Sequence, residues 1–257
     1  MAVDLGILSN SFFVPAGKVI HAGASLCQER DEYLAAGFAP VIWLEALTSV
    51  SELGAANLLN YPGQSIHNVT LWSQSDQKKV IYESSNEGQS SSLLKMKWHK
   101  FVHSSVIEIG AETHLTTTLD DFLHSNDFFG PISLLVLDLQ GVELHVLEGA
   151  QETLGMATAV VVEVALIEMY ESQPLAANIH EFMSAHGFIL VHHDLVSSST
   201  IGDALYVSQI HAQRFDLSEI EFPRATKHAY LFMLKLREDL HRLGVPMKLM
   251  KRPFKKS

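Results

Sequence analysis

Two acidic residues accompany apolar runs that are typical of buried strands. Asp138 comes directly after Leu134–Leu137, and Glu163 lies within the β-branched run Ala157–Ala165. Because strands buried on both faces read as continuous apolar runs, both carboxylates are expected at or near the carboxyl ends of neighbouring strands. There they can orient or deprotonate a substrate hydroxyl, or hold a hard cation such as Mg²⁺. The structural alternatives are a helix cap for Asp138 and a satisfied network with backbone amides or a tyrosine for Glu163.

A second set of residues is typical of a site for a nucleoside-containing cofactor. A predicted strand runs into a turn of small residues, Gly23, Ala24 and Ser25. Small residues let the backbone approach a ligand, and the helix that follows is expected to present free N–H groups to an anion. Glu45, about twenty residues further on, ends a second strand, where a carboxylate can accept hydrogen bonds from ribose hydroxyls. These features leave both NAD and S-adenosylmethionine open as cofactors.

Histidines and serines supply further candidates for contacts with ligands. His21 lies inside the first turn, where it can touch the cofactor. His99 and His103 follow a serine-rich loop and are possible substrate contacts, as are the hydroxyls of Ser90, Ser91 and Ser92. The run 192–194 has no metal-ligand spacing, because neighbours on a strand point to opposite faces. A Ser-His-Asp hydrolase is poorly supported, since the chain has no Gly-x-Ser-x-Gly elbow.

An alternation of predicted strands and helices must position these residues. Strands are predicted at 18–25, 40–46 and 67–73, with helices at about 26–36 and 49–59 between them. This order, with short connections, indicates a parallel sheet wound by right-handed crossovers. The excursion at about 74–130 is long enough to predict a lid or substrate loop over the strand ends.

The second half of the chain continues the same pattern. Its predicted elements are a strand at 134–137, a helix from Glu143 through Leu154, a strand at 157–165, a helix opened by Pro174, and strands at 188–196 and 204–207. The last two strands are expected to be joined through Gly202-Asp203 and to run antiparallel. An amphipathic helix is predicted at 226–243.

Composition excludes several classes of protein. The single cysteine, Cys27, rules out an internal disulfide framework, and no apolar run is long enough to span a membrane. We see no signal peptide, which predicts a cytoplasmic protein. The net charge of −11 argues against a nucleic-acid partner. Residues 210–257 hold 11 of the 18 Lys and Arg residues and carry +6, so that residues 1–209 carry −17.

The run Leu137–Ala150, Leu-Asp-Leu-Gln-Gly-Val-Glu-Leu-His-Val-Leu-Glu-Gly-Ala, resembles the signature of FkbM-type methyltransferases. That signature is an Asp-x-(Glu/Gln)-Gly-x-Glu core followed by Val-Leu-x-Gly. Further segments agree in order, namely 20–24, 41–46, 89–94 with 118–120, and 202–206. The resemblance spans about residues 18–209 and departs from the family pattern around His21 and Cys27.

The resemblance implies a seven-stranded, mainly parallel α/β sheet of the class I methyltransferase (Rossmann-like) type, and S-adenosylmethionine as the cofactor. It implies O-methylation of a hydroxyl on a sugar or natural product, hence a small-molecule or glycan acceptor and no nucleic acid. Gly23, Ala24 and Ser25 would face the methionine portion, Glu45 would hold the ribose, and Asp138 would also lie beside the cofactor. Trp72 and Ser73, at the end of the third strand, would flank the adenine.

Several points stay open from the sequence. Either Asp138 or Glu163 is expected to be the base, and Mg²⁺ between them is a further possibility. Residues 1–209 are expected to form the methyltransferase domain, with an inserted region at about 74–130, and residues 210–257 a basic helical extension packed on it. The rival hypotheses are an NAD-dependent oxidoreductase, disfavoured by the missing Gly-x-Gly-x-x-Gly, and a non-catalytic nucleotide-binding or scaffold protein. The oligomeric state is not determined by the sequence.

Overall fold

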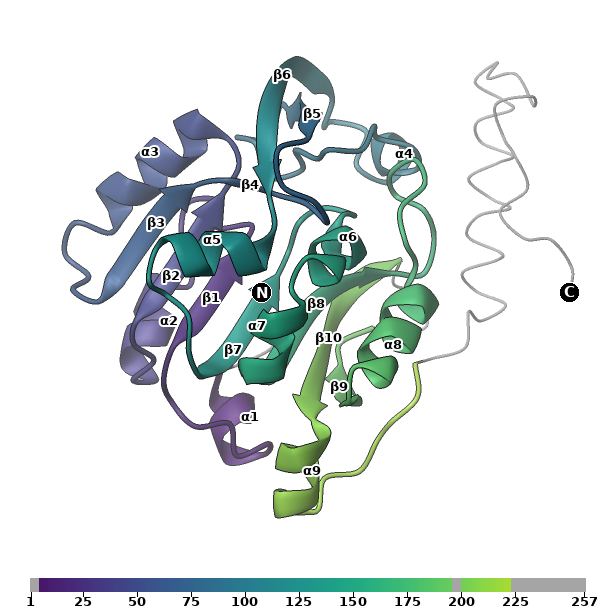
Figure 1. The fold of residues 1–257 in the computed structure, drawn as a ribbon. Coiled ribbons are helices and arrows are strands. Elements are labelled where there is room, and N and C mark those ends of the chain that lie inside the picture. Colours follow the sequence, from purple (N-terminus) through teal and green to yellow (C-terminus); the bar gives the residue numbers. More distant parts are fainter. Residues whose placement is uncertain (1–4, 196–199, 223–257) are drawn as a thin grey trace, which may run out of the picture.

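A computed structural model describes residues 5–195 and 200–222 (Figure 1). Its main sheet has seven strands in the order β3-β2-β1-β7-β8-β10-β9. All of them run parallel except β10, which is antiparallel to both of its neighbours. The strands are β1 (Val19–Ala22), β2 (Val41–Glu45), β3 (Gln64–Asn68), β7 (Ile132–Leu137), β8 (Ala157–Ala165), β9 (Phe188–His193) and β10 (Ile201–Ser208). The prediction of a seven-stranded, mainly parallel class I methyltransferase sheet is confirmed.

The direction in which successive strands are added to the sheet reverses at β1. From β1 the strand order runs outward through β2 to β3, and the chain then returns to place β7 on the other side of β1. Every residue of β1 is buried, and β7 and β8 are almost wholly buried, because helices cover both faces of these strands. In open α/β sheets ligands bind outside the carboxyl ends of the strands at such a switch point. The ends of β1 and β7 therefore mark where a ligand site is expected.

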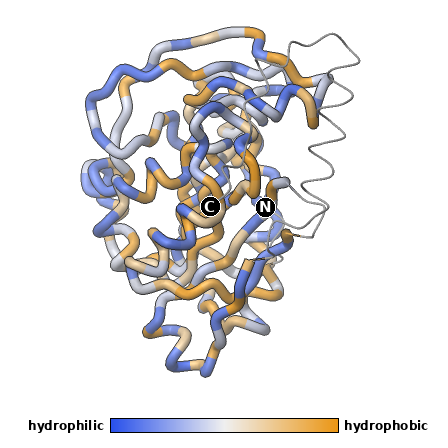
Figure 2. Tube along the Cα trace, turned by 90° about the vertical axis from the view of Figure 1, so that its right-hand side faces the viewer, coloured by the Kyte–Doolittle hydropathy of each residue, from blue (hydrophilic) through white to orange (hydrophobic). Residues whose placement is uncertain are grey.

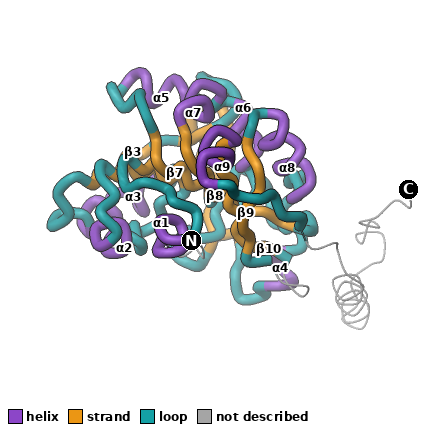
Figure 3. Tube along the Cα trace, turned by 90° about the horizontal axis from the view of Figure 1, so that it is seen from below, coloured by secondary structure: helices purple, strands orange, loops and turns teal. Residues whose placement is uncertain are grey.

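Two layers of helices enclose the sheet (Figure 3). On one face, Leu123, Val146, Leu154 and Met183, from four different helices, pack into one hydrophobic cluster. On the other face, Leu8, Tyr33 and Ala212 belong to a second cluster. Figure 2 shows hydrophobic (orange) and hydrophilic (blue) stretches alternating along the chain. The helices are α1 (Leu5–Asn10), α2 (Arg30–Ala35), α3 (Thr48–Asn57), α5 (Leu119–Ser125), α6 (Glu143–Glu148), α7 (Gln151–Met156), α8 (Ala176–Ala185) and α9 (Gln209–Phe215).

A smaller sheet stands over the carboxyl ends of the parallel strands (Figure 1). Its strands are β4 (Thr70–Leu71), β6 (Glu108–Thr117) and β5 (Lys78–Ser84), in the order β4-β6-β5. Between β5 and β6 the chain forms a long connection, residues 85–107, which we call the insertion loop; it contains α4 (His99–Val102). The predicted inserted region thus contains a sheet of its own. The domain boundary predicted at 209 stays a prediction, and most of the predicted extension, including the helix at 226–243, lies outside the described residues.

The third strand differs from the prediction of 67–73. It is Gln64–Asn68. Val69 N still donates to Glu45 O of β2 (2.8 Å), and the chain then leaves the main sheet because Thr70 pairs with Thr116 of β6. Long-range pairing with β6, which local β propensity cannot report, therefore ends β3 early.

Three other boundaries were predicted wrongly. The first helix begins at Arg30 rather than 26, because Ser25 and Cys27 have φ of 45° and 54° and so cannot be helical. The helix from Glu143 ends at Glu148, and α7 begins separately at Gln151. Gly202 and Asp203 lie inside β10 rather than in the turn before it. Among the described residues, no helix is long and apolar enough to cross a membrane.

Candidate active site

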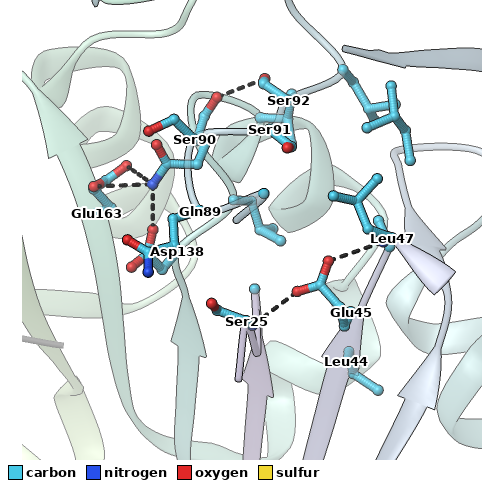
Figure 4. A pocket seen from close by; sticks show the side chains of 18 of the residues that line it. Ser25, Leu44, Glu45, Leu47, Gln89, Ser90, Ser91, Ser92, Asp138 and Glu163 are labelled. Carbon is cyan, nitrogen blue, oxygen red and sulfur yellow. Dashed lines mark hydrogen bonds between the residues drawn. The ribbon is translucent and has the colours of Figure 1, made fainter. Parts of the chain in front are cut away.

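A cavity of about 490 Å³ lies at the carboxyl ends of β1, β2, β7 and β8, beneath the insertion loop (Figure 4). Its volume is within the usual range for small-molecule sites. Most of the residues predicted from the sequence to form the site line it: His21, Gly23, Ser25, Glu45, Ser90, Ser91, Ser92, His99, Asp138 and Glu163. The structure thus brings the predicted cofactor and acceptor residues to one place.

Glycine is required at the end of β1. Gly23 has φ of +88°, and a Cβ on it would lie 1.8 Å from the backbone oxygen of Asp138. Only glycine combines this conformation with so close an approach of β1 and β7. The ends of the two central strands are therefore drawn together directly beneath the cavity.

The backbone amides of the first turn are already bonded within the protein. The N–H groups of Gly23 and Ala24 donate to Leu44 O (2.9 and 3.0 Å), and Ser25 N donates to Glu45 Oε2 (2.8 Å). The Ala24 side chain is buried in the core and does not line the cavity. The turn is therefore satisfied internally and offers an anion none of these three donors.

Glu45 ends β2 and binds the backbone on two sides (Figure 4). Besides the bond to Ser25, its Oε1 accepts from Leu47 N at 2.9 Å. Burial raises the pKa of the Glu45 carboxyl above its ordinary value, although these backbone bonds oppose the shift. Each carboxylate oxygen keeps a second lone pair, so Glu45 can accept a further hydrogen bond from a ligand in the cavity.

Asp138 and Glu163 form a carboxylate pair joined by an amide. Gln140 Nε2 donates to Asp138 Oδ1 (2.8 Å) and lies 3.3 and 3.5 Å from the two oxygens of Glu163. Burial raises the pKa of Asp138 to about 6. Burial, together with the charge of Asp138, raises the pKa of Glu163 well above its ordinary value. Both carboxyl groups therefore keep their protons to a higher pH than exposed Asp and Glu side chains do.

Glu143 has a role that the sequence did not reveal. It stands at the start of α6, and its side chain is buried and accepts from Leu139 N (2.9 Å) and Gly141 N (3.0 Å). Burial raises the pKa of this carboxyl to about 7. Glu143 therefore holds the turn between β7 and α6 in shape.

The serine side chains mostly build the insertion loop. Ser91 Oγ accepts from Ser84 N (3.0 Å), and Ser90 N donates to Ser84 Oγ (3.1 Å). Ser92 Oγ donates to Gln140 O at 2.7 Å, which attaches the loop to the end of β7. The loop thus lies over the carboxylate pair with hydroxyl and amide groups along the cavity.

Two buried histidines in the cavity wall are uncharged at neutral pH. Burial lowers the pKa of His21 to about 4, and its ring stacks on that of Trp43 with centroids 4.5 Å apart. Burial, and secondarily the nearby His103, lower the pKa of His99 to about 4 as well. His99 is 4% exposed, and its Nδ1 has no hydrogen-bond partner in the described structure. A ligand with a hydroxyl or amide group could satisfy that nitrogen.

Trp72 and Ser73 do not line the cavity. Because β3 ends at Asn68, these residues follow β4 instead of the third strand. The Trp72 ring packs on the His145 ring (centroids 4.1 Å apart), and Lys79 Nζ lies 4.1 Å from its centroid. The structure therefore gives no support to an adenine contact by these two residues.

The cavity is acidic. Four carboxylates line it, from Glu29, Glu45, Asp138 and Glu163, and no described Lys or Arg does so. In the described part of the chain, no group of three or more His, Cys, Asp or Glu residues is placed to hold a metal ion. Between Asp138 and Glu163, where Mg²⁺ was considered, the Gln140 amide provides the shared contact instead.

Gln140 is the main residue that the sequence reasoning missed as a member of the site. It belongs to the Asp-x-Gln-Gly run, and a polar residue beside a glycine at a strand end was the available signal. Its φ is +54°, a conformation that few residues other than glycine adopt. The carboxamide is directed between the two carboxylates as a result of this turn.

Comparison with known proteins gives one family match. The model of the methyltransferase FkbM domain matches residues 28–190. No curated protein matches the chain.

Solved structures resemble the chain only distantly. One is magnesium protoporphyrin IX methyltransferase from Synechocystis with bound S-adenosylmethionine, at 12% identity over 79% of this chain and 76% of that one, with a TM-score of 0.47. Another is a putative tRNA (m1A22) methyltransferase from Streptococcus pneumoniae, at 11% identity over 93% and 88%, with a TM-score of 0.45.

Proposed function

The chain belongs to the FkbM family of S-adenosylmethionine-dependent methyltransferases, and from this premise we propose that it methylates a hydroxyl oxygen of a sugar or another small natural product. The observation that carries the proposal is the carboxylate pair, Asp138 and Glu163, beside the first turn and below a loop lined with hydroxyl and amide groups. An alcohol must lose its proton on methylation, and a carboxylate with a pKa near neutrality suits that task.

The residues present fit the cofactor. At neutral pH S-adenosylmethionine carries a net positive charge, and the cavity offers four carboxylates with no described Lys or Arg. When bound, this cofactor supplies an electrophilic methyl group on a sulfonium. Glu45 would accept from its ribose hydroxyls, and Gly23 and Ser25 would border its methionine portion.

The same features disfavour a dinucleotide. NAD carries a pyrophosphate, which needs free amides or cationic side chains near the first turn. The amides of Gly23, Ala24 and Ser25 are already engaged, and the cavity wall is acidic. We therefore rank an oxidoreductase below a methyltransferase.

The residues of the chain would act on the acceptor as follows. The insertion loop would orient the acceptor hydroxyl through Ser90, Ser91 and the neutral imidazole of His99. The hydroxyl proton would pass to the carboxylate pair as the oxygen takes up the methyl group, which the bound cofactor would supply with its sulfonium sulfur as the leaving group. Positioning supplies much of the rate in such an in-line displacement.

The charge of the cavity supports a small acceptor over a nucleic acid. A polyanionic substrate would bring phosphates toward carboxylates, without the Lys and Arg contacts that such binding requires. We therefore propose a small-molecule or glycan acceptor that brings no phosphate into the cavity.

Calorimetry and a transfer assay test the proposal. We expect S-adenosylmethionine and S-adenosylhomocysteine to bind and NAD not to bind. A panel of sugars and polyketides incubated with methyl-labelled cofactor should yield a product whose NMR spectrum shows an O-methyl group. Labelling of nitrogen, carbon or sulfur would reject the O-methyl assignment, and binding of NAD alone would reject the methyltransferase.

A further inference from the structure

Gln140 lies at the junction of the carboxylate pair and the insertion loop, held in an unusual backbone conformation. Its φ of +54° is followed by +100° at Gly141. Glu143 fixes this turn by accepting from the amides on either side of Gln140, at Leu139 and Gly141. The side chain of Glu143 therefore stabilises this turn, as expected where a residue with a strained backbone has a function.

The contacts of the carboxamide determine its orientation. Nε2 carries two hydrogens and faces two carboxylates, at 2.8 Å from Asp138 and 3.3 Å from Glu163. Oε1 accepts from Tyr170 Oη at 2.8 Å. If the amide were turned over, its oxygen would face the carboxylates and its N–H groups would face a hydroxyl donor. The chemistry of its neighbours thus selects this one orientation.

Two further contacts connect Gln140 to the insertion loop. Its backbone oxygen accepts from Ser92 Oγ at 2.7 Å. The Tyr170 hydroxyl that donates to its side chain also lies 3.1 Å from Ser90 O. The same residue therefore contacts the loop through its main chain and, by way of a tyrosine, through its side chain.

We propose that Gln140 is a positioning residue that holds Asp138 and Glu163 as a pair on either side of its side-chain amide, and that fastens the insertion loop above that pair. This inference deepens the proposed function and rests on it for the role of the pair as proton acceptor. The amide supplies one N–H to each carboxylate, which stabilises negative charge on the pair. The loop contacts keep the amide between the two groups.

Other acidic groups near the pair oppose the effect of the amide, because their negative charge raises the pKa values of Asp138 and Glu163. Asp203 on β10 is the register partner of Glu163, and Glu143 and Glu29 add further negative charge from the start of α6 and the segment before α2. The phenol of Tyr170 is neutral, because burial raises its pKa far above the ordinary value. Without the amide, this field and burial would keep protons on the pair to a higher pH.

Two substitutions of Gln140 test the positioning role. Gln140→Met keeps the length of the side chain and removes both its donors and its acceptor. Gln140→Leu also lacks both donors and adds no charge, so it remains informative if the Met variant folds poorly. Gln213→Met, on the exposed side of α9, is the matched control.

Two readouts are needed, and neither requires a known acceptor. In carboxyl ¹³C NMR titrations, with Asp138→Asn and Glu163→Gln used to assign the signals, the apparent pKa of the pair should rise by about one unit or more in both variants. The contact of Ser92 with the backbone oxygen of Gln140 survives these substitutions, so Ser92→Ala, which removes it, tests the fastening role: amide hydrogen exchange in residues 84–94 should become at least about tenfold faster, and the control should match the wild type in both measurements.

The outcomes separate this inference from the proposed function. An unchanged titration of the pair in either folded Gln140 variant would overturn the positioning role, and unchanged loop exchange in folded Ser92→Ala would overturn the fastening role. Failure of the wild type to bind S-adenosylmethionine would reject the proposed function, while the titration and exchange data would still decide whether Gln140 positions the pair. Once an acceptor is known, the acid limb of the activity profile should move to higher pH in both variants.

Discussion

Replacement of Glu45 by alanine tests the part of the site assigned to the cofactor. The carboxylate ends β2, accepts from Ser25 N and Leu47 N, and faces the cavity. A charge-assisted hydrogen bond to a ribose hydroxyl contributes about 1.5–3 kcal/mol. Since every 1.4 kcal/mol is a factor of about ten in affinity, Glu45→Ala should raise the Kd for S-adenosylhomocysteine by about 10- to 100-fold.

The same substitution removes the hydrogen-bond acceptors of two backbone N–H groups, those of Ser25 and Leu47. An unsatisfied buried N–H costs about 1–3 kcal/mol, and the cost is at the low end where water from the cavity can replace the carboxylate. Against a typical free energy of unfolding of about 5–15 kcal/mol, the variant should still fold. Glu45→Gln keeps one oxygen as an acceptor and should lose less affinity and less stability than Glu45→Ala.

Isothermal calorimetry at neutral pH measures the affinity, and thermal unfolding without ligand measures the stability separately. Glu52→Ala, on the exposed side of α3, is the control for removing a carboxylate nearby. A folded Glu45→Ala protein with the wild-type Kd would refute the reasoning. The pKa of Glu45 is raised by burial, so affinity should also fall as the pH is lowered toward that pKa and the carboxylate becomes protonated.

Four other outcomes are expected. Gly23→Ala should abolish cofactor binding or folding, as judged by calorimetry and circular dichroism, because its Cβ would overlap the backbone at the end of β7. Replacing Ser90, Ser91 and Ser92 together by Ala should reduce acceptor turnover far more than cofactor affinity; wild-type turnover would remove the loop from the active site. The pKa of Glu143 is raised to about 7 in the folded state, so the native protein binds more protons than the unfolded chain between about pH 4.5 and 7, and stability should fall as the pH rises through this range. Glu143→Gln should remove this loss of stability, which is on the order of 3 kcal/mol across the range, as measured by urea titrations at several pH values; an unchanged pH dependence would contradict the assignment. Full transfer activity in EDTA is expected because an amide joins the carboxylate pair, and loss of activity restored by Mg²⁺ would show that the pair does hold a cation.

Local sequence was sufficient for much of the scaffold. The apolar run before Asp138 and the β-branched run around Glu163 predicted β7 and β8, because a strand buried on both faces requires such residues. Small residues after β1 and an acid at the end of β2 placed Gly23 and Glu45 beside the cavity, since parallel strands end at one edge of the sheet. The antiparallel pairing of β9 with β10 was likewise predicted.

Only the tertiary structure decided which of these side chains contact one another and how far the pKa values of their carboxyl groups are shifted. Trp72 and Ser73 lie away from the cavity because pairing of β4 with β6, more than forty residues later, draws the chain out of the main sheet. Gln140 was not recognised from its position in the sequence, because its role depends on a positive φ and on partners from β8, Tyr170 and the insertion loop. The raised pKa of Asp138 follows from burial beneath that loop. Periodicity along the chain reports which residues are buried, whereas the meeting of residues distant in sequence, and the electric field where they meet, exist only once the chain has folded.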